Sequence, residues 1–129
     1  MPKKLIQTAH GAPPLGAYSQ GFRAGDFVFT AGTGPIDPVS AKVVGSTIEE
    51  QTHQTLKNIG AILEAAGATY ADVVKATVHL SDPLLFPRFN AVYSQYFPDP
   101  KPARTTVGSR MDQVPGMMVE IDVVAYTGA

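Results

Sequence analysis

The chain has 129 residues, which suits a single domain, and only 16% of them are Asp, Glu, Lys or Arg, against about 25% in typical soluble domains. A net charge of −1 and no apolar run near the roughly 18 residues of a membrane span favour a soluble, cytoplasmic protein that binds neither nucleic acid nor membrane. The absence of Cys excludes disulfides, thiolate metal sites and a cysteine nucleophile.

The first part of the chain predicts short strands separated by loops. The pair Gly25-Asp26 suits the tight turn of a β-hairpin between two of these strands. Segment 9–16 contains two Gly and two Pro and is expected to form a loop. Strands are expected at 4–8, 18–24 and 27–31.

The first helix has the clearest predicted boundaries, at about 47–66. Ser46 and Glu49 fit a capping box with Ser46 as the N-cap, and Gly67 suits the left-handed position that ends a helix. Apolar residues recur along the segment at helical spacing, which predicts one buried stripe made of Leu56, Ile59, Leu63 and Ala66.

The second half of the chain predicts one further helix and three strands. Pro87 fits the first turn of this helix, whose apolar pattern continues to Phe97. Segment 98–100, Pro-Asp-Pro, is expected to stop it. Strands are expected at 73–80, 103–109 and 117–127.

The resulting order, βββ-α-β-α-ββ, predicts an α+β fold in one domain spanning 1–129. Two helices are too few to cover both faces of a six-stranded sheet, so we expect both on one face. Alternation gives the strand at 73–80 a core face made of Val74, Ala76, Val78 and Leu80. The outer face of the last strand mixes apolar and acidic residues: Met118, Glu120, Asp122, Val124 and Tyr126. Because charge is scarce, we expect this surface to be buried between subunits.

The motifs of common catalytic sites are absent. Residues 32–34, Gly-Thr-Gly, lack the third Gly of a dinucleotide-binding loop. His10, His53 and His79 do not have metal-ligand spacing, so no metal is expected. His53 falls on the polar side of the first helix, where we expect it to be solvated.

Three side chains are candidates for chemistry. Arg104 opens a strand on the face of Thr106, where its guanidinium can hold a carboxylate through two parallel hydrogen bonds. Glu120 is an acid in a strongly apolar strand, where burial raises and a nearby Arg lowers the pKa of a carboxyl, so it can be poised for proton transfer. The alternatives are a structural Arg–Glu pair or two unrelated solvated charges. Tyr18 either lines a cleft or caps the core.

Seven segments taken together resemble the Rid (reactive intermediate deaminase, YjgF-like) family. They are GAYSQG (16–21), FTAGTGPIDP (29–38), the helix from 51 that ends in LEAAGA, DVVKATVHLSD (72–82), FNAVYSQYF (89–97), PARTTV (102–107) and VEIDVVA (119–125). The resemblance covers nearly the whole chain. It implies a chorismate-mutase-like fold that forms a homotrimer with sites between subunits.

The same resemblance implies an activity without a cofactor or metal. The substrate would be an enamine or imine such as 2-aminoacrylate, released by pyridoxal-phosphate-dependent dehydratases, and the products a 2-oxo acid and ammonia. Arg104 would clamp the substrate carboxylate, Glu120 would activate water and transfer protons, and Tyr18 would pack over the ligand. Because an imine carbon is already electrophilic, one acid–base group beside a held water suffices without a covalent nucleophile.

Further site residues are implied by the same carry-over. Gly32 and Thr106 would supply backbone hydrogen bonds to the substrate, and Asn90 would occupy a supporting position. The best-known members have Ser where this chain has Ala31, Gln where it has Thr33, and often Cys where it has Thr106. Ala31 removes a hydroxyl from the pocket wall, which leaves the identity of the substrate open.

The leading hypothesis is therefore a 2-iminobutanoate/2-iminopropanoate deaminase-type hydrolase that protects pyridoxal enzymes from metabolite damage. One alternative is a deaminase of a larger catabolic enamine, such as an aminomuconate-like compound. Another is a non-catalytic regulatory trimer that binds 2-oxo acids. RNA cleavage, to which some family members have been linked, is disfavoured by the net charge of −1 and the lack of a basic, aromatic stripe.

Overall fold

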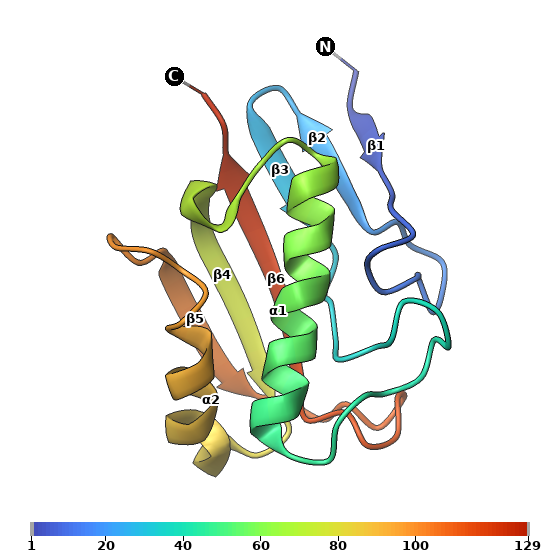
Figure 1. Ribbon diagram of the computed structural model, residues 1–129, viewed down its shortest axis with the longest axis vertical. Coiled ribbons are helices and arrows are strands. Elements are labelled where there is room, and N and C mark those ends of the chain that lie inside the picture. The colour runs from blue at the N-terminus through green and yellow to red at the C-terminus, as the bar shows by residue number, and fades with distance from the viewer. Residues whose placement is uncertain (1, 129) are drawn as a thin grey trace.

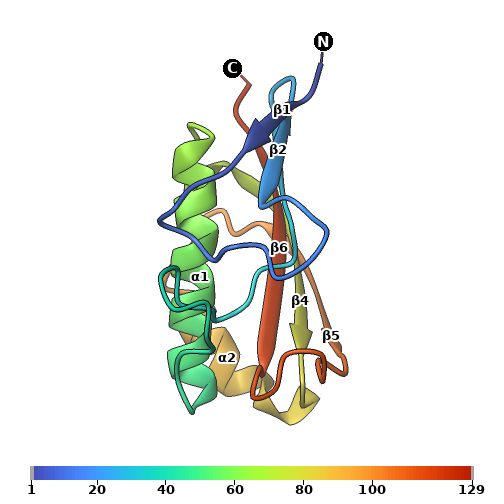
Figure 2. The same ribbon diagram turned by 90° about the vertical axis from the view of Figure 1, so that its right-hand side faces the viewer.

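A six-stranded mixed sheet forms the centre of the protein, and both α-helices lie on one of its faces (Figure 1; Figure 2). This computed structural model describes residues 2–128. The strands are β1 (Lys4–Ile6), β2 (Gly21–Ala24), β3 (Phe27–Thr30), β4 (Val73–Leu80), β5 (Ala103–Gly108) and β6 (Val119–Tyr126). The helices are α1 (Ile48–Ala65) and α2 (Phe86–Tyr93), with the short 3-10 helices η1 (Tyr70–Asp72) and η2 (Pro83–Leu85). The predicted fold class is confirmed.

The strand order is β1-β2-β3-β6-β4-β5, so the last strand of the chain lies in the middle of the sheet. Neighbouring strands are antiparallel except β4 and β5, which run parallel because η2 and α2 form a crossover between them. The predicted hairpin of β2 and β3 turns at Gly25, whose φ of 59° is left-handed.

The core lies between the sheet and the two helices. The predicted apolar stripe of α1 is confirmed, because Leu56, Ile59 and Leu63 are fully buried. Each such side chain stabilises the fold by about 1.5–3 kcal/mol through removal of apolar surface from water. The strand face that meets the helices is also apolar, and on β6 it consists of Val119, Ile121, Val123 and Ala125.

A bulge in β4 corrects the predicted core face of that strand. Val73 pairs with Ala125 and Lys75 pairs with Val124, so Val74 is the extra residue between them. Val74 is consequently 46% exposed, whereas Val73 is buried in its place. Simple alternation cannot reveal a one-residue insertion, which is why the placement of Val74 on the core face was wrong.

The start of α1 lies one residue later than the capping pattern predicted. Thr47, not Ser46, is the N-cap, since its hydroxyl accepts the Glu50 N–H at 3.2 Å while the Glu50 carboxylate accepts the Thr47 N–H at 3.2 Å. This register buries Ile48 and frees Glu49 for a bidentate pair with Arg88 of α2, at 2.7 and 2.8 Å. Both registers fit the motif, and contacts with the core and α2 select between them.

The second helix is shorter than the apolar pattern predicted. α2 ends at Tyr93, and the next residues form turns with bonds such as Gln95 N–H to Val92 C=O. Phe97 nevertheless remains buried. The pattern therefore identified the buried side chains correctly but could not show where α-helical hydrogen bonding stops.

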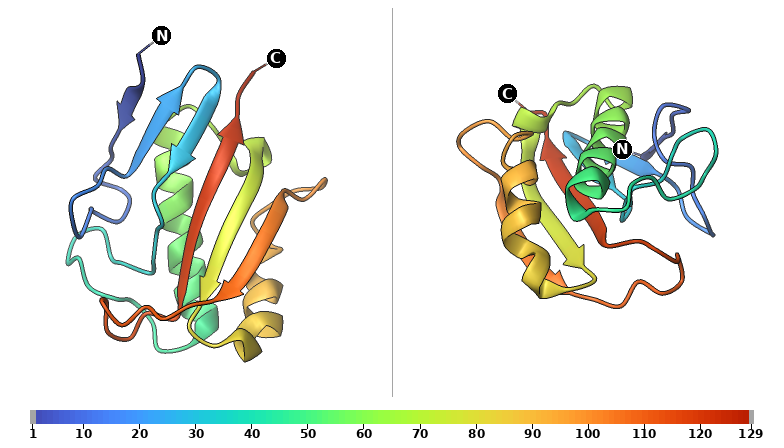
Figure 3. Two further views of the ribbon diagram at one scale, coloured as in Figure 1. Left: turned by 180° about the vertical axis from the view of Figure 1, so that it is seen from behind. Right: turned by 60° about the horizontal axis from the view of Figure 1, so that its bottom comes forward.

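The sheet face away from the helices carries no helix (Figure 3, left). We call it the open face; its apolar residues are Phe27, Phe29, Val107, Val124 and Tyr126. Phe27 stacks beside Phe29 and packs on Tyr126, with ring centroids 6.3 and 5.0 Å apart. The prediction that one face would remain without helices is confirmed. Within residues 2–128, neither helix is long and apolar enough to cross a membrane.

Candidate active site

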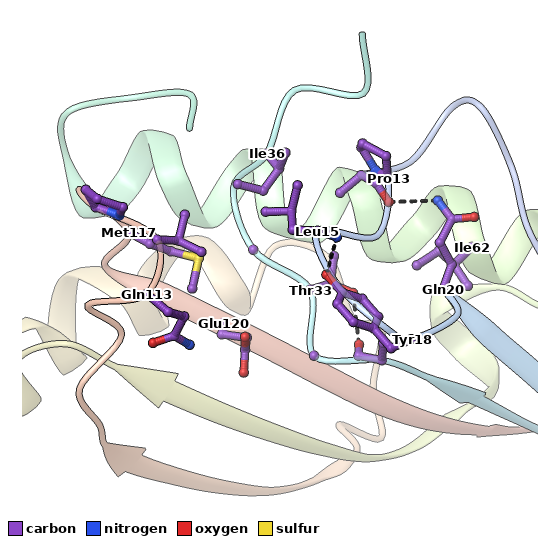
Figure 4. Close-up of a pocket in the computed structure, with 16 residues that line it drawn as sticks. Pro13, Leu15, Tyr18, Gln20, Thr33, Ile36, Ile62, Gln113, Met117 and Glu120 are labelled. Atoms are coloured by element: carbon purple, nitrogen blue, oxygen red, sulfur yellow. Dashed lines mark hydrogen bonds between the residues drawn. The ribbon is translucent and has the colours of Figure 1, made fainter. Parts of the chain in front are cut away.

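A pocket of about 610 Å³ opens where the chain leaves β3, a volume in the usual range for small-molecule sites. Its walls come from β6, α1 and three loops (Figure 4). They are formed by Ala12, Pro13, Leu15, Tyr18, Gln20, Ala31, Gly32, Thr33, Gly34, Ile36, Ile62, Gln113, Val114, Pro115, Met117 and Glu120. Most of this lining is apolar, and none of the described lining residues is Lys, Arg or His.

Glu120 is the only carboxylic acid among those lining residues, and Gly32 holds it closely. A Cβ atom on Gly32 would lie 2.8 Å from Glu120 Oε2 and 2.9 Å from its Cδ, so no larger residue fits without moving the carboxylate. Reciprocal backbone hydrogen bonds between Thr33 and Ile121, at 2.8 and 2.9 Å, fix this segment beside β6. The Glu120 carboxylate therefore lies directly against the Gly32 backbone.

Tyr18 also lines the pocket, as one of its two predicted roles required. Its hydroxyl accepts the Leu15 N–H at 2.9 Å, which ties the ring to the loop that precedes β2. The side chain is 48% exposed, so it borders the opening and does not cap the core. Figure 4 shows Tyr18 and Leu15 on one side of the pocket and Glu120 with Gln113 on the other.

Arg104 lies outside this pocket. It pairs with Ala76 of β4, which places it on the face that meets the helices, and its guanidinium donates to Asn90 Oδ1 at 2.8 Å. The guanidinium carbon lies 5.2, 5.9 and 4.7 Å from the ring centroids of three aromatic residues of α2: Phe86, Phe89 and Tyr93. Burial raises the pKa of the Tyr93 hydroxyl, and Arg104 partly opposes that rise.

The six predicted site residues therefore fall into two groups within one chain. Tyr18, Gly32 and Glu120 border the pocket, whereas Arg104, Asn90 and Thr106 belong to β5 and α2. Alternation puts Glu120 on the open face and Arg104 on the helix-covered face of the same sheet. The alternative of a structural Arg104–Glu120 pair within the chain is wrong, because the sheet separates their side chains.

Two histidines have partners that the sequence did not indicate. His53 is half-buried, with its Nδ1 2.7 Å from the Tyr96 hydroxyl, so its predicted solvated position is wrong; residues 93–97 fold back against α1. His79 Nδ1 lies 2.7 Å from Ser109 Oγ on the open-face side of β4. Nearby, burial raises the pKa of the Asp122 carboxyl, while His79 and Lys75 partly oppose that rise.

Several lining residues were missed by sequence reasoning. Gln20, Gln113 and Met117 carry no motif of their own, and the loops that hold them meet only in the folded chain. The aromatic residues of α2 did follow a helical spacing, but that spacing indicated a core and gave no sign of Arg104 above them. Among residues 2–128, no group of three or more His, Asp or Glu side chains is arranged to hold a metal ion.

The fold and the pocket define a small α+β protein whose single sheet carries helices on one face, with an acid-containing pocket where β3 ends and β6 begins. Its sequence matches the family described as Endoribonuclease L-PSP over residues 9–127. The chain belongs to this family, which is also known as the YjgF or Rid family.

Named relatives extend the comparison. RutC family protein PH0854 of Pyrococcus horikoshii is 46% identical over 125 residues, covering 96% of this chain and 98% of its own. A Bos taurus protein named 2-iminobutanoate/2-iminopropanoate deaminase is 39% identical over 127 residues, covering 98% and 91%. The solved structure of the Rid-family protein YyfA from Yersinia pestis matches with a TM-score of 0.89 at 34% identity, covering 97% and 99%. These names support a deaminase of the Rid class and leave its substrate open.

Proposed function

We propose that this protein hydrolyses imines of small 2-amino acids, and the enamines that tautomerise to them, to 2-oxo acids and ammonia. The observation that carries the proposal is the Glu120 carboxylate, which lies against Gly32 in a mostly apolar pocket. An apolar site with one positioned acid–base group suits proton transfer to and from a bound water. The deaminase name of the bovine relative supports the same class of reaction.

The reaction needs one water and one proton carrier. Glu120 accepts a proton from water as the water oxygen attacks the imine carbon, and the C=N π electrons move to nitrogen. Glu120 then returns the proton to nitrogen, which gives a carbinolamine. It next takes the proton of the hydroxyl and delivers it to nitrogen, so that the C–N bond breaks, ammonia leaves and C=O forms. For an enamine such as 2-aminoacrylate, protonation of the terminal carbon first gives the imine.

We propose further that the active site is completed by a second copy of the chain, as a homotrimer with intersubunit sites would provide. The pocket around Glu120 contains no described basic residue, yet the substrate carries a carboxylate. Arg104, braced by Asn90 and the aromatic rings of α2, is suited to clamp that carboxylate but belongs to the other sheet face of the same chain. The apolar open face supports such an assembly.

The test is a coupled assay in which a pyridoxal-phosphate-dependent threonine or serine dehydratase supplies the unstable intermediate. We expect the wild-type protein to accelerate 2-oxobutanoate or pyruvate formation over spontaneous hydrolysis. Glu120→Gln and Arg104→Ala should each lower the acceleration by about 100-fold or more, since one removes the proton carrier and the other the carboxylate clamp. Arg110→Ala serves as the matched control, because it removes a guanidinium that is 91% exposed and does not line the pocket.

Two outcomes would contradict the proposal. Equal rates with and without the wild-type protein would exclude the deaminase activity, and equal acceleration by Arg104→Ala would exclude the carboxylate clamp. Binding of 2-oxo acids without turnover would favour a regulatory protein. Turnover confined to a larger enamine would favour a catabolic deaminase, an alternative that Ala31 in the pocket wall keeps open.

A further inference from the structure

Three buried side-chain amides hydrogen-bond to the segments around the pocket, and the proposed reaction does not use them as catalytic groups. Gln20, Gln51 and Asn58 are 5%, 1% and 1% exposed. A buried amide destabilises a protein unless its donors and acceptors find partners, so these residues are held strictly by the groups they contact. All their partners but one, the Gln54 side chain, are backbone groups in the segments that form or adjoin the pocket walls.

Gln51, on α1, is bonded to the backbone at the C-terminal end of the loop that contains Val114 and Pro115, and to the backbone of Gly45 before α1. Its Nε2 donates to Gly116 C=O at 2.8 Å and to Gly45 C=O at 3.1 Å, and its Oε1 accepts the Met118 N–H at 2.7 Å. The loop residues Gln113 to Met117 form the pocket wall beside Glu120.

Asn58 lies two turns further along α1 and holds a second wall. Its Nδ2 donates to Gly34 C=O at 3.0 Å and to Ile36 C=O at 2.8 Å, and both of these residues line the pocket. Its Oδ1 accepts a hydrogen bond from Gln54 at 3.1 Å, so the amide is used at both ends. The segment that Asn58 holds directly follows Gly32, which supports the Glu120 carboxylate.

Gln20 holds the third wall from the other side. Its Oε1 accepts the Thr8 N–H at 2.7 Å, and its Nε2 donates to Thr8 C=O at 3.1 Å and Ala12 C=O at 2.7 Å. Ala12 and its neighbour Pro13 line the pocket, and Figure 4 shows Pro13 on the other side of it from Glu120. These three loops lack the regular backbone hydrogen bonds of a strand pair. Each of them is hydrogen-bonded to one buried side-chain amide.

Two further buried polar residues of α1 provide the contrast. The Thr52 hydroxyl donates to Ile48 C=O within the helix at 2.7 Å, and the Thr55 hydroxyl has no hydrogen-bond partner among the described residues. Both are fully buried, like Gln51 and Asn58, but neither bonds to a pocket wall. Burial on α1 and attachment to the pocket are therefore separate properties.

We propose that Gln20, Gln51 and Asn58 are positioning residues that hold the three loop walls of the pocket in the arrangement needed for imine hydrolysis. This inference rests on the proposed function for its catalytic part. Gln51 and Asn58 do not line the pocket, and the amide of Gln20, which does, is used by the backbone of Thr8 and Ala12. All three act by keeping the pocket preformed around Glu120. Small displacements of such a wall lower catalysis strongly, because the water and the imine carbon must stay aligned.

The experiment compares Gln51→Met and Asn58→Leu, which preserve approximate volume, with the matched controls Thr52→Val and Thr55→Val. Mass spectrometry then measures the rate of backbone hydrogen exchange in the loops that form the pocket walls. Gln51→Met should speed exchange in the segment 113–118 and Asn58→Leu in the segment 33–37, and neither control should do so. Both amide variants should lower kcat/KM for imine hydrolysis by about tenfold or more, against less than about threefold for the controls at comparable loss of Tm.

Gln51→Glu keeps the proposal testable if Gln51→Met does not fold. The carboxylate still accepts the Met118 N–H, but it repels the Gly45 and Gly116 carbonyl oxygens to which the amide donates. We therefore expect a loss of activity of about tenfold or more and faster exchange in 113–118. The proposal is wrong if wall exchange is unchanged in the folded amide variants, or if activity follows Tm equally in amide variants and controls. Absence of wild-type turnover would instead refute the proposed function, while the exchange data still decide whether the amides hold the walls.

Discussion

Gly32 and Glu120 show how one small residue determines the position of a reactive group. The missing Cβ of Gly32 leaves the space in which the Glu120 carboxylate lies, and the Thr33–Ile121 bridge keeps the two backbones in register. Glycine is required here because of the close approach of a side chain, and not because of an unusual backbone angle. A Gly at the end of a strand can thus determine where a neighbouring carboxylate lies through the space that it leaves open.

We predict that Gly32→Ala lowers deaminase activity by about tenfold or more, since the added methyl group must push the carboxylate out of position. Gly11→Ala is the control, because its Cβ would meet only ordinary contacts of 3.4–3.5 Å. Coupled kinetics and circular dichroism measure activity and folding. Full activity in a folded Gly32→Ala protein would show that the position of Glu120 is not critical.

Tyr70 illustrates how contacts between elements determine stability. It lies in η1, and its hydroxyl donates to Leu56 C=O of α1 at 2.6 Å, passing the position where Gly60 has no side chain. Its ring also packs edge-on against Tyr96 and Phe97, with centroids 5.6 Å away in each case. A Cβ on Gly60 would lie 2.1 Å from the hydroxyl, so this glycine makes the contact possible.

The buried position of the Tyr70 hydroxyl makes the stability of the fold fall at high pH. Burial raises the pKa of Tyr70 to about 12, whereas an unfolded tyrosine ionises near pH 10. Between these values the unfolded chain releases a proton that the folded chain retains, so the Tyr70 contribution to stability is complete below about pH 10 and is lost as pH rises toward 12. Tyr70→Phe should be less stable by about 1 kcal/mol near pH 8, because it lacks the hydrogen bond to Leu56.

Urea unfolding of both proteins from pH 8 to 12 measures this effect. The advantage of wild type over Tyr70→Phe in free energy of unfolding should shrink and then change sign as pH rises from about 10 to 12, because a shift of two pKa units is worth about 2.7 kcal/mol, more than the hydrogen bond contributes. A constant difference across that interval would show that Tyr70 titrates normally in the folded protein.

At the scale of the whole molecule, the sheet separates the two groups of catalytic candidates. Glu120 and Arg104 cannot meet within one chain, so the proposed site needs a second copy that brings its Arg104 to the pocket of the first. The open face, with Phe27, Phe29 and Tyr126 exposed, offers the apolar surface that such an association would cover. The low charge content of the chain agrees with this arrangement.

Hybrid assemblies test the arrangement directly. Arg104→Ala and Glu120→Gln subunits, each inactive alone, should recover activity when they are co-expressed or refolded together, because a subunit with an intact Arg104 can face one with an intact Glu120. Random mixing in a closed ring predicts about a quarter of the wild-type sites. Separately folded and unmixed variants are the control, and analytical ultracentrifugation gives the size of the assembly. No recovery in verified hybrids would place both residues in one subunit's site.

Local patterns were sufficient for much of the fold. Alternation and helical spacing predicted the order of the elements, the stripe on α1 and the helix-free sheet face, because each depends on neighbours a few residues apart. These patterns gave wrong predictions where a contact with a distant residue decides between two locally acceptable structures. The three cases are the Thr47 N-cap, which leaves Glu49 to pair with Arg88, the bulge at Val74 and the early end of α2. The individual site candidates were visible as Tyr18, Arg104 and Glu120, but their spatial grouping was not.

The sequence by itself determined which residues this protein can use: its length, its scarcity of charge, its periodic apolar residues and an ordered set of segments that identified the family. Only the tertiary structure decided that Gly32 supports Glu120, that buried amides reach the pocket walls, and that Arg104 lies behind the sheet. The physical reason is that periodicity reports which side of an element a residue occupies, whereas a site is made by side chains and loops that meet only when the sheet and helices have packed.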